Sequence, residues 1–164
     1  MIRNLQNINY WKETIKENED FSVKLLSKDL IRGNKFLASL VNANENTELL
    51  CVEILINNKN EVVSYFKGVF KKDILNVNLI KNDNIIKIFD FISSVSVKAN
   101  VILSMVYLDD TEEKFFMMRS GDKMLMLNSK YYTNEGIFGN LQEITRVDSF
   151  EFFEGGRLEE LLTS

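Results

Sequence analysis

Residues 49–70 read LLCVEILINNKNEVVSYFKGVF, and this stretch decides the fold class that we predict. Apolar side chains alternate along its first half, at Leu50, Val52, Ile54 and Ile56. A polar turn at residues 57–60 follows, and β-branched and aromatic residues resume at Val62. Alternation with a period of two, bounded by turn residues, is typical of a β-hairpin. We therefore predict two antiparallel strands here, with one face turned toward a core.

The residues before this hairpin predict one helix and two further strands. Residues 9–18 place Trp11 on an apolar face at helical spacing, and we expect Trp11 to anchor the core. Apolar residues alternate over 21–26 and again over 35–43, which favours strands. A helix through 27–41 is the alternative, but it would carry Gly33 in its interior at a cost of about 1 kcal/mol relative to alanine.

The residues after the hairpin predict a central helix and a second block of strands. Ile85, Ile88, Phe89 and Ile92 form one apolar stripe, so residues 84–95 are expected to be helical. Beyond that helix we expect a three-stranded meander, then a loop, a strand and a short terminal helix. Their ranges are 101–108, 115–118 and 124–127 for the meander, 131–139 for the loop, 141–153 for the strand and 157–163 for the helix.

Together these elements predict an α+β fold in a single domain over residues 1–164. The length of 164 residues suits one domain. Its sheet is expected to be mainly antiparallel and built from two meander-like blocks, at about 21–80 and 99–153, on either side of the central helix. A short N-terminal helix and a short C-terminal helix complete the expected architecture.

The composition narrows the chemistry. The chain has no histidine and one cysteine, Cys51, so serine–histidine and cysteine–histidine catalytic devices are excluded. We find no glycine-rich phosphate loop, no signal peptide and no apolar run long enough to span a membrane. We expect a cytoplasmic protein without a cofactor or a metal, with Cys51 as a small buried apolar residue.

The charge is uneven along the chain. The formal net charge is −4, and residues 109–164 are acidic while residues 1–108 are slightly basic. A broad basic footprint for nucleic acid is therefore absent, although Lys67, Lys71 and Lys72 offer a local basic patch. An acidic surface with an exposed aromatic residue suits a basic protein partner. The residues expected to form that surface are Asp148, Glu151, Phe153, Glu154, Arg157, Glu159 and Glu160.

These observations favour a non-enzymatic protein-binding domain of the inhibitor, immunity-protein or antitoxin kind. One alternative is a metal-dependent enzyme of the nuclease type, because carboxylates are the ligands that hard cations prefer. Its candidate cluster is Asp109, Asp110, Glu112 and Glu113. Another alternative is an assembly subunit of a phage or multiprotein complex. Such a subunit would form a homo-oligomer through an exposed sheet edge or through the methionine-rich strands expected at 115–127.

Overall fold

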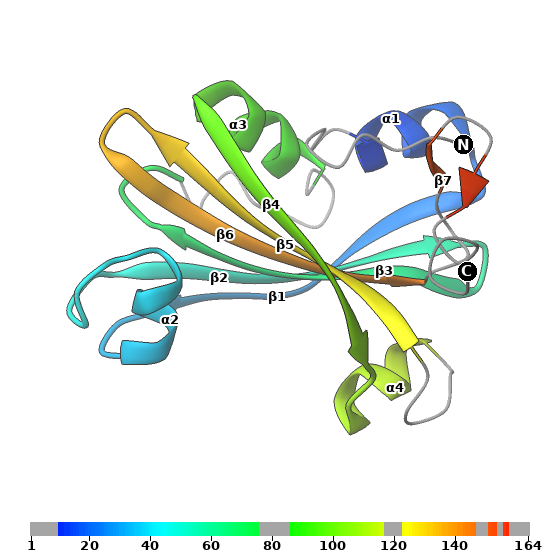
Figure 1. The fold of residues 1–164 in the computed structure, drawn as a ribbon, viewed down its shortest axis with the longest axis horizontal. Coiled ribbons are helices and arrows are strands. Elements are labelled where there is room, and N and C mark those ends of the chain that lie inside the picture. Colours follow the sequence, from blue (N-terminus) through cyan, green and yellow to red (C-terminus); the bar gives the residue numbers. More distant parts are fainter. Residues whose placement is uncertain (1–9, 76–85, 117–122, 147–150, 154–155, 158–164) are drawn as a thin grey trace.

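The computed structural model describes residues 10–75, 86–116, 123–146, 151–153 and 156–157 (Figure 1). Its centre is a strongly twisted six-stranded antiparallel sheet with strand order β1-β2-β3-β6-β5-β4. The strands are β1 (Phe21–Ile31), β2 (Leu49–Asn58), β3 (Glu61–Lys71), β4 (Lys98–Tyr107), β5 (Lys123–Thr133) and β6 (Gly136–Arg146). A separate two-stranded ribbon joins β7 (Glu151–Phe153) to β8 (Gly156–Arg157). The predicted single α+β domain with an antiparallel sheet is confirmed.

The hairpin predicted from residues 49–70 is β2 and β3. Its strands pair in antiparallel register, with Leu50 opposite Phe70 and Ile54 opposite Phe66. The first three strands and the last three strands each follow one another in space, and the two groups meet where β3 pairs with β6. This junction makes one continuous sheet of the two blocks, so they share one core.

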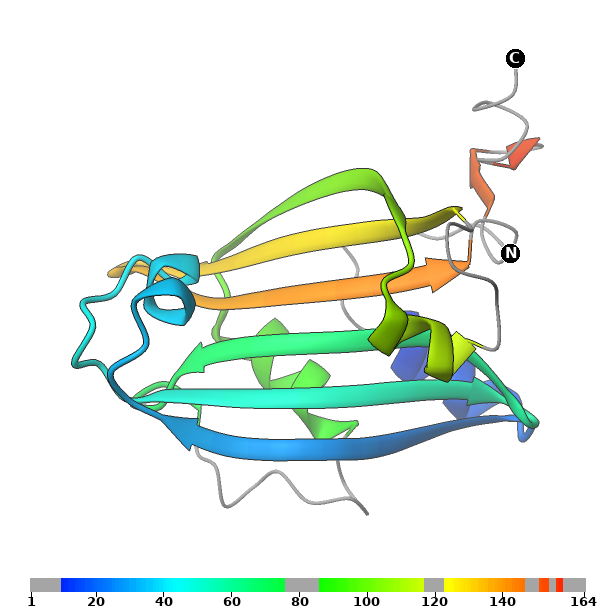
Figure 2. The same cartoon turned by 90° about the horizontal axis from the view of Figure 1, so that it is seen from below.

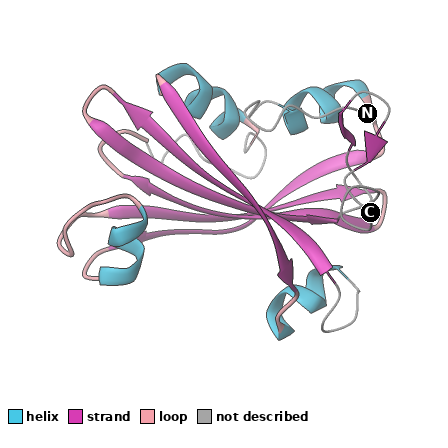
Figure 3. Ribbon diagram, in the orientation of Figure 1, coloured by secondary structure: helices cyan, strands magenta, loops and turns pink. Residues whose placement is uncertain are grey.

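Four helices lie on the two faces of the sheet (Figure 3). The helices α1 (Tyr10–Glu17) and α3 (Lys87–Val95) cover one face, whereas α2 (Lys35–Leu40) and α4 (Asp110–Phe116) lie near opposite ends of the other face (Figures 1 and 2). The predicted N-terminal and central helices are thus confirmed within the described residues. The α3 stripe of Ile88, Phe89 and Ile92 is buried, as predicted. Among the described helices, none is long and apolar enough to cross a membrane.

The main core lies between the sheet and the helices α1 and α3. Every second residue of the strands points into it, which follows from the period of two in a β-strand. Trp11 is 3% exposed and packs in this core, so its predicted role as an anchor is confirmed. The aromatic side chains around it include Phe66, Phe70, Phe89 and Phe138.

A buried polar group ties α1 to this core. Trp11 Nε1 donates a hydrogen bond of 2.8 Å to Glu143 Oε2, and Ser64 Oγ donates one of 2.7 Å to the same oxygen. Glu143 is 3% exposed and belongs to β6. Because a buried carboxylate is costly unless it is hydrogen-bonded, these donors are part of what makes the residue tolerable inside the core.

Two glycines make room for the Phe70 ring. Phe70 is fully buried, and it lies opposite Gly139 in the pairing of β3 with β6. A Cβ atom added to Gly139 would lie 2.5 Å from the ring, and one added to Gly68 would lie 2.6 Å from it. No real side chain tolerates such a contact, so the ring occupies the space that the two missing side chains leave.

The segment expected as a strand at 35–43 is instead the helix α2. Asn34 supplies the reason, because its side chain accepts a hydrogen bond of 2.9 Å from the backbone N–H of Leu37 and so caps the helix. Gly33, with a φ of 82°, makes the turn between β1 and that cap. The strand expected at 21–26 is confirmed and continues to Ile31.

The second block differs from the prediction in three places. The helix α4 includes Phe115 and Phe116, which were expected in a strand at 115–118. The loop expected at 131–139 is wrong, because β5 runs to Thr133 and β6 begins at Gly136, with a φ of 119° at that glycine. Tyr131 and Phe138 are buried on this hairpin, and core packing therefore extends both strands. The strand expected at 141–153 stops at Arg146 in β6, and the helix expected at 157–163 lies outside the described residues except for Arg157 in β8.

Candidate functional site

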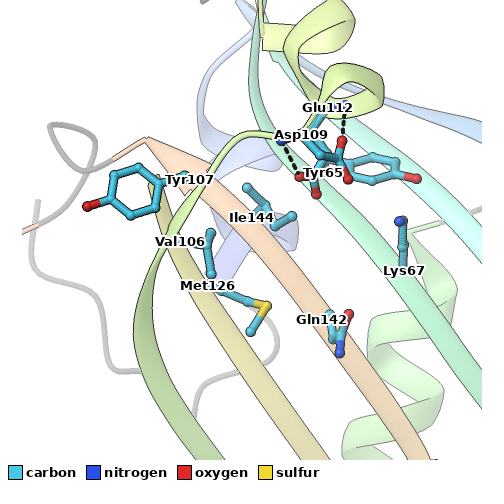
Figure 4. Close-up of a pocket in the computed structure, with 9 residues that line it drawn as sticks. All are labelled: Tyr65, Lys67, Val106, Tyr107, Asp109, Glu112, Met126, Gln142 and Ile144. Carbon is cyan, nitrogen blue, oxygen red and sulfur yellow. Dashed lines mark hydrogen bonds between the residues drawn. The ribbon is translucent and has the colours of Figure 1, made fainter. Parts of the chain in front are cut away.

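A pocket of about 230 Å³ opens on the sheet face that carries α4 (Figure 4). Its floor comes from β3, β5 and β6, and its walls come from the end of β4 and the start of α4. The residues that line it are Tyr65, Lys67, Val106, Tyr107, Asp109, Glu112, Met126, Gln142 and Ile144.

The register of the strands brings the floor residues together. Tyr65 lies opposite Ile144 and Lys67 lies opposite Gln142 in the pairing of β3 with β6. Met126 of β5 lies opposite Ile144 on the other side. Directly opposed residues in antiparallel strands have Cβ atoms about 4.5–5.5 Å apart, so these side chains form one continuous patch.

The helix α4 is held over this patch by reciprocal hydrogen bonds at its start. Asp109 Oδ1 accepts a bond of 2.8 Å from the backbone N–H of Glu112, and Glu112 Oε1 accepts one of 3.2 Å from the backbone N–H of Asp109. This is a capping box. The ring of Phe115 stacks on that of Tyr65 at 4.9 Å, which fixes the other end of the helix against the sheet.

The signal for this capping box is also visible in the sequence. Asp109 and Glu112 have the spacing of a capping box, and an apolar pair, Phe115 and Phe116, follows. That signal was present in the sequence and would have predicted the start of a short helix.

Two polar residues of the pocket floor, Tyr65 and Lys67, differ in their interactions with carboxylates. Tyr65 donates a hydrogen bond of 2.8 Å to Glu53 Oε1, and Ser27 donates one of 3.2 Å to Glu53 Oε2. Burial, together with this bond to Glu53, holds the pKa of the Tyr65 phenol far above its usual range, so Tyr65 stays protonated. Lys67 forms no ion pair with any carboxylate of the described residues, and its Nζ lies 5.6 Å from the centre of the Tyr65 ring.

Glu112 is the most buried carboxylate of the pocket, with 7% of its surface exposed. Burial, and secondarily the neighbouring charge of Asp109, raises the pKa of the Glu112 carboxyl above the ordinary value of 4.5. The backbone bond from Asp109 opposes this shift without reversing it. The ionised form of Glu112 therefore lowers the free energy of unfolding at neutral pH.

Exchanging Glu112 for glutamine is expected to raise the free energy of unfolding at pH 7. A carboxyl with a raised pKa binds its proton more tightly in the folded protein, so the wild type gains stability as the pH falls through that pKa. Glutamine keeps the acceptor that the capping box needs and has no charge to bury. The difference in free energy of unfolding between Glu112→Gln and the wild type should become smaller as the pH falls toward 4.5. Urea denaturation at a series of pH values checks this, and a difference that does not change with pH would refute it.

The carboxylate cluster expected at 109–113 does not assemble a metal site within the described residues. No group of three or more cysteine, aspartate and glutamate residues there has the geometry to hold a metal ion. Asp109 and Glu112 line the pocket and cap α4, while Asp110 begins that helix. The side chain of Glu113 lies outside the description. Cys51 is partly buried beside α2, and burial raises the pKa of its thiol.

The acidic surface expected near the C-terminus is only partly described. Glu151 and Phe153 lie in β7, and the backbone of Glu151 pairs with that of Arg157 in β8. The remaining expected residues, Asp148, Glu154, Glu159 and Glu160, lie outside the described residues. In the basic patch expected at Lys67, Lys71 and Lys72, Lys72 Nζ lies 3.3 Å from Glu48 Oε1 and is neutralised there, whereas Lys67 faces the pocket.

Comparison with known proteins adds a likeness of fold. No family model and no curated protein matches the sequence. Among solved structures, the effector domain of PhnF from Mycobacterium smegmatis is similar with a TM-score of 0.73 and 13% identity, over 93% of this chain and 96% of that one. A GntR-family transcriptional regulator from Bacillus cereus is similar with a TM-score of 0.71 and 13% identity, over 82% of this chain and 97% of that one.

The fold is that of the GntR C-terminal domain. A third similar structure is the possible transcriptional regulator YydK from Bacillus subtilis, with a TM-score of 0.67, 14% identity and 84% of this chain covered. The chain spans 63% of the length of YydK. The prediction of an inhibitor, immunity protein or antitoxin is wrong, because the structures that share this fold are regulators and regulatory domains.

Proposed function

We propose that this chain is the effector-binding domain of a transcriptional regulator and that it binds a small polar molecule in the pocket beneath α4. The observation that carries the proposal is the match to the effector domain of PhnF over nearly the whole of both chains. Identity of 13% does not transfer a ligand. The binding site and its ligand must therefore be inferred from the residues that line the pocket.

The pocket supports binding in two ways. It combines an apolar wall of Val106, Met126 and Ile144 with a few polar groups that converge on one space, which is the usual make-up of a ligand site. Lys67 and Gln142 also have polar atoms that make no side-chain hydrogen bond or ion pair within the described part of the chain. A ligand would supply those partners.

The charge of the chain supports a sensing role over direct contact with DNA. The formal net charge is −4, and a DNA-binding surface needs clustered lysine and arginine to neutralise phosphates. Ligand binding can also affect the helix α4, because Asp109 and Glu112 both line the pocket and cap that helix. Contacts to these carboxylates would shift the position or stability of that helix.

Blocking the pocket tests the proposal. Thermal unfolding is measured with a panel of amino acids, simple carboxylates, simple amines, sugar phosphates and nucleosides. At least one class should raise the melting temperature, because a ligand that binds only the folded state stabilises it. The variant Gln142→Trp places a large ring on the pocket floor and is expected to abolish that shift.

Lys130→Trp is the matched control, since Lys130 lies on β5 outside the lining residues. It should retain the shift seen in the wild type. If no compound shifts the melting temperature of the wild type, or if the shift survives in Gln142→Trp, the proposed site is wrong.

A further inference from the structure

Two neighbouring polar side chains, Lys67 and Gln142, line the floor of the pocket. The two residues lie directly opposite each other in the pairing of β3 with β6. An ammonium group and a side-chain amide together supply several hydrogen-bond donors. A carboxylate offers two acceptor oxygens and satisfies both residues at once.

A carboxylate lies on the opposite wall. Asp109 Oδ1 accepts a bond of 2.8 Å from the backbone N–H of Glu112. Asp109 is exposed to solvent at the pocket wall.

Lys67 is near enough to Glu112 for its charge to oppose the rise of the Glu112 pKa, but it forms no direct ion pair with either carboxylate. Neither Asp109 nor Glu112 comes within ion-pair distance of Lys67. Figure 4 shows the two carboxylates beside each other under α4, with Lys67 and Gln142 further along the strands. Val106, Met126 and Ile144 complete the lining with an apolar surface. A ligand that matches this lining needs an anionic group, a cationic group and a short apolar part.

We infer that the effector is a small zwitterion of the α-amino-acid type. Its carboxylate is bound by Lys67 and Gln142, its ammonium group by Asp109, and its side chain by the apolar wall. The size agrees, because a pocket of about 230 Å³ lies below the range of roughly 300–1,000 Å³ that holds drug-sized ligands. This inference rests on the proposed function, and it names the chemical class of the ligand.

The test uses the full chain and the twenty proteinogenic amino acids as probes. Thermal shift identifies the amino acid that binds best, and titration calorimetry measures its affinity. Its deaminated carboxylate and its decarboxylated amine are titrated in parallel. Each lacks one of the two charged groups and is expected to bind about tenfold or more weakly, since a hydrogen bond to a charged group contributes about 1.5–3 kcal/mol.

Two charge-removing variants locate the groups. Lys67→Met keeps the length of the side chain, and Asp109→Asn keeps a good helix cap, so both should fold. Each is expected to weaken binding of the amino acid about tenfold or more. Lys67→Met should leave the affinity of the amine unchanged, and Asp109→Asn should leave that of the carboxylate unchanged. Lys24→Met and Asp110→Asn, at exposed positions outside the pocket, are the matched controls.

The outcomes separate this inference from the proposed function. One outcome is that a carboxylate, phosphate or amine that lacks the second charge binds as well as any amino acid and loses its binding in Gln142→Trp. In that case the pocket binds an effector, but the inference of a zwitterionic ligand is wrong. If no amino acid binds, the zwitterion is wrong as well. If no compound of the wider panel binds either, the proposed function fails with it.

Discussion

Replacing Glu143 by alanine is expected to lower the free energy of unfolding by about 2–3 kcal/mol. Glu143 Oε2 accepts the bonds from Trp11 Nε1 and Ser64 Oγ, and all three residues are buried. Ser64 Oγ can turn to Thr145 Oγ1, which is 2.8 Å away. In the variant Trp11 Nε1 loses its bond to Glu143 within the core, where Trp11 is 3% exposed. Urea denaturation followed by circular dichroism measures the loss.

Glu143→Gln is the matched control. The amide oxygen of glutamine can accept both bonds, so this variant should lose much less stability than Glu143→Ala. In Trp11→Phe the indole donor is already absent, and the further replacement Glu143→Ala should then cost less than it does in the wild type, as a double-mutant cycle would show. Equal losses for alanine and glutamine at position 143 would mean that the acceptor oxygen does not stabilise the fold.

Exchanging Gly139 for alanine is expected to cost about 1–3 kcal/mol, which is the usual penalty for overpacking a core. The new methyl group would meet the Phe70 ring at 2.5 Å. Phe70 is fully buried on a central strand, and Gly68 closes in on the same ring from the other side. The ring therefore has no free space to move into, and the backbone of β3 or β6 must shift. Thermal and urea denaturation report the change.

A smaller side chain at position 70 should relieve the clash. Phe70→Leu alone is destabilising, because it removes buried ring atoms. In that background the further replacement Gly139→Ala should cost less than in the wild type, so the double variant is more stable than the sum of the single losses predicts. Strict additivity of the two replacements would contradict the proposed packing of the ring against the glycine.

Local patterns predicted the parts of the fold that depend on local contacts. The hairpin from Leu49 to Lys71 and the central helix were readable because their apolar residues repeat at the period of their secondary structure. The helix α2 could not be predicted in this way, because the alternation of Phe36, Ala38 and Leu40 resembles a strand. Only the recognition of Asn34 as a cap indicates a helix. At Tyr131 and Phe138 core packing continues the strands through residues that resemble a loop.

The candidate pocket depends on pairings between distant segments. Ser64 and Glu143, neighbours across β3 and β6, are separated by 79 positions in the chain. Because the order of strands places β3 beside β6, Lys67 meets Gln142 and Tyr65 meets Ile144. A shift of β6 by one residue in this register would turn Gln142 and Ile144 to the other face, away from Lys67 and Tyr65. No pattern within either strand specifies that register, so the sequence alone did not reveal the pocket.

The bond between Trp11 and Glu143 also provides an optical probe of the molecule. The chain has a single tryptophan, and it lies in α1 at the contact between that helix and the sheet. When the indole is excited at a wavelength that the five tyrosines do not absorb, its fluorescence comes from one site. Detachment of α1 would expose the indole to water and shift its emission to longer wavelength while the strands remain paired. The helix can thus be observed separately from the sheet without any added label.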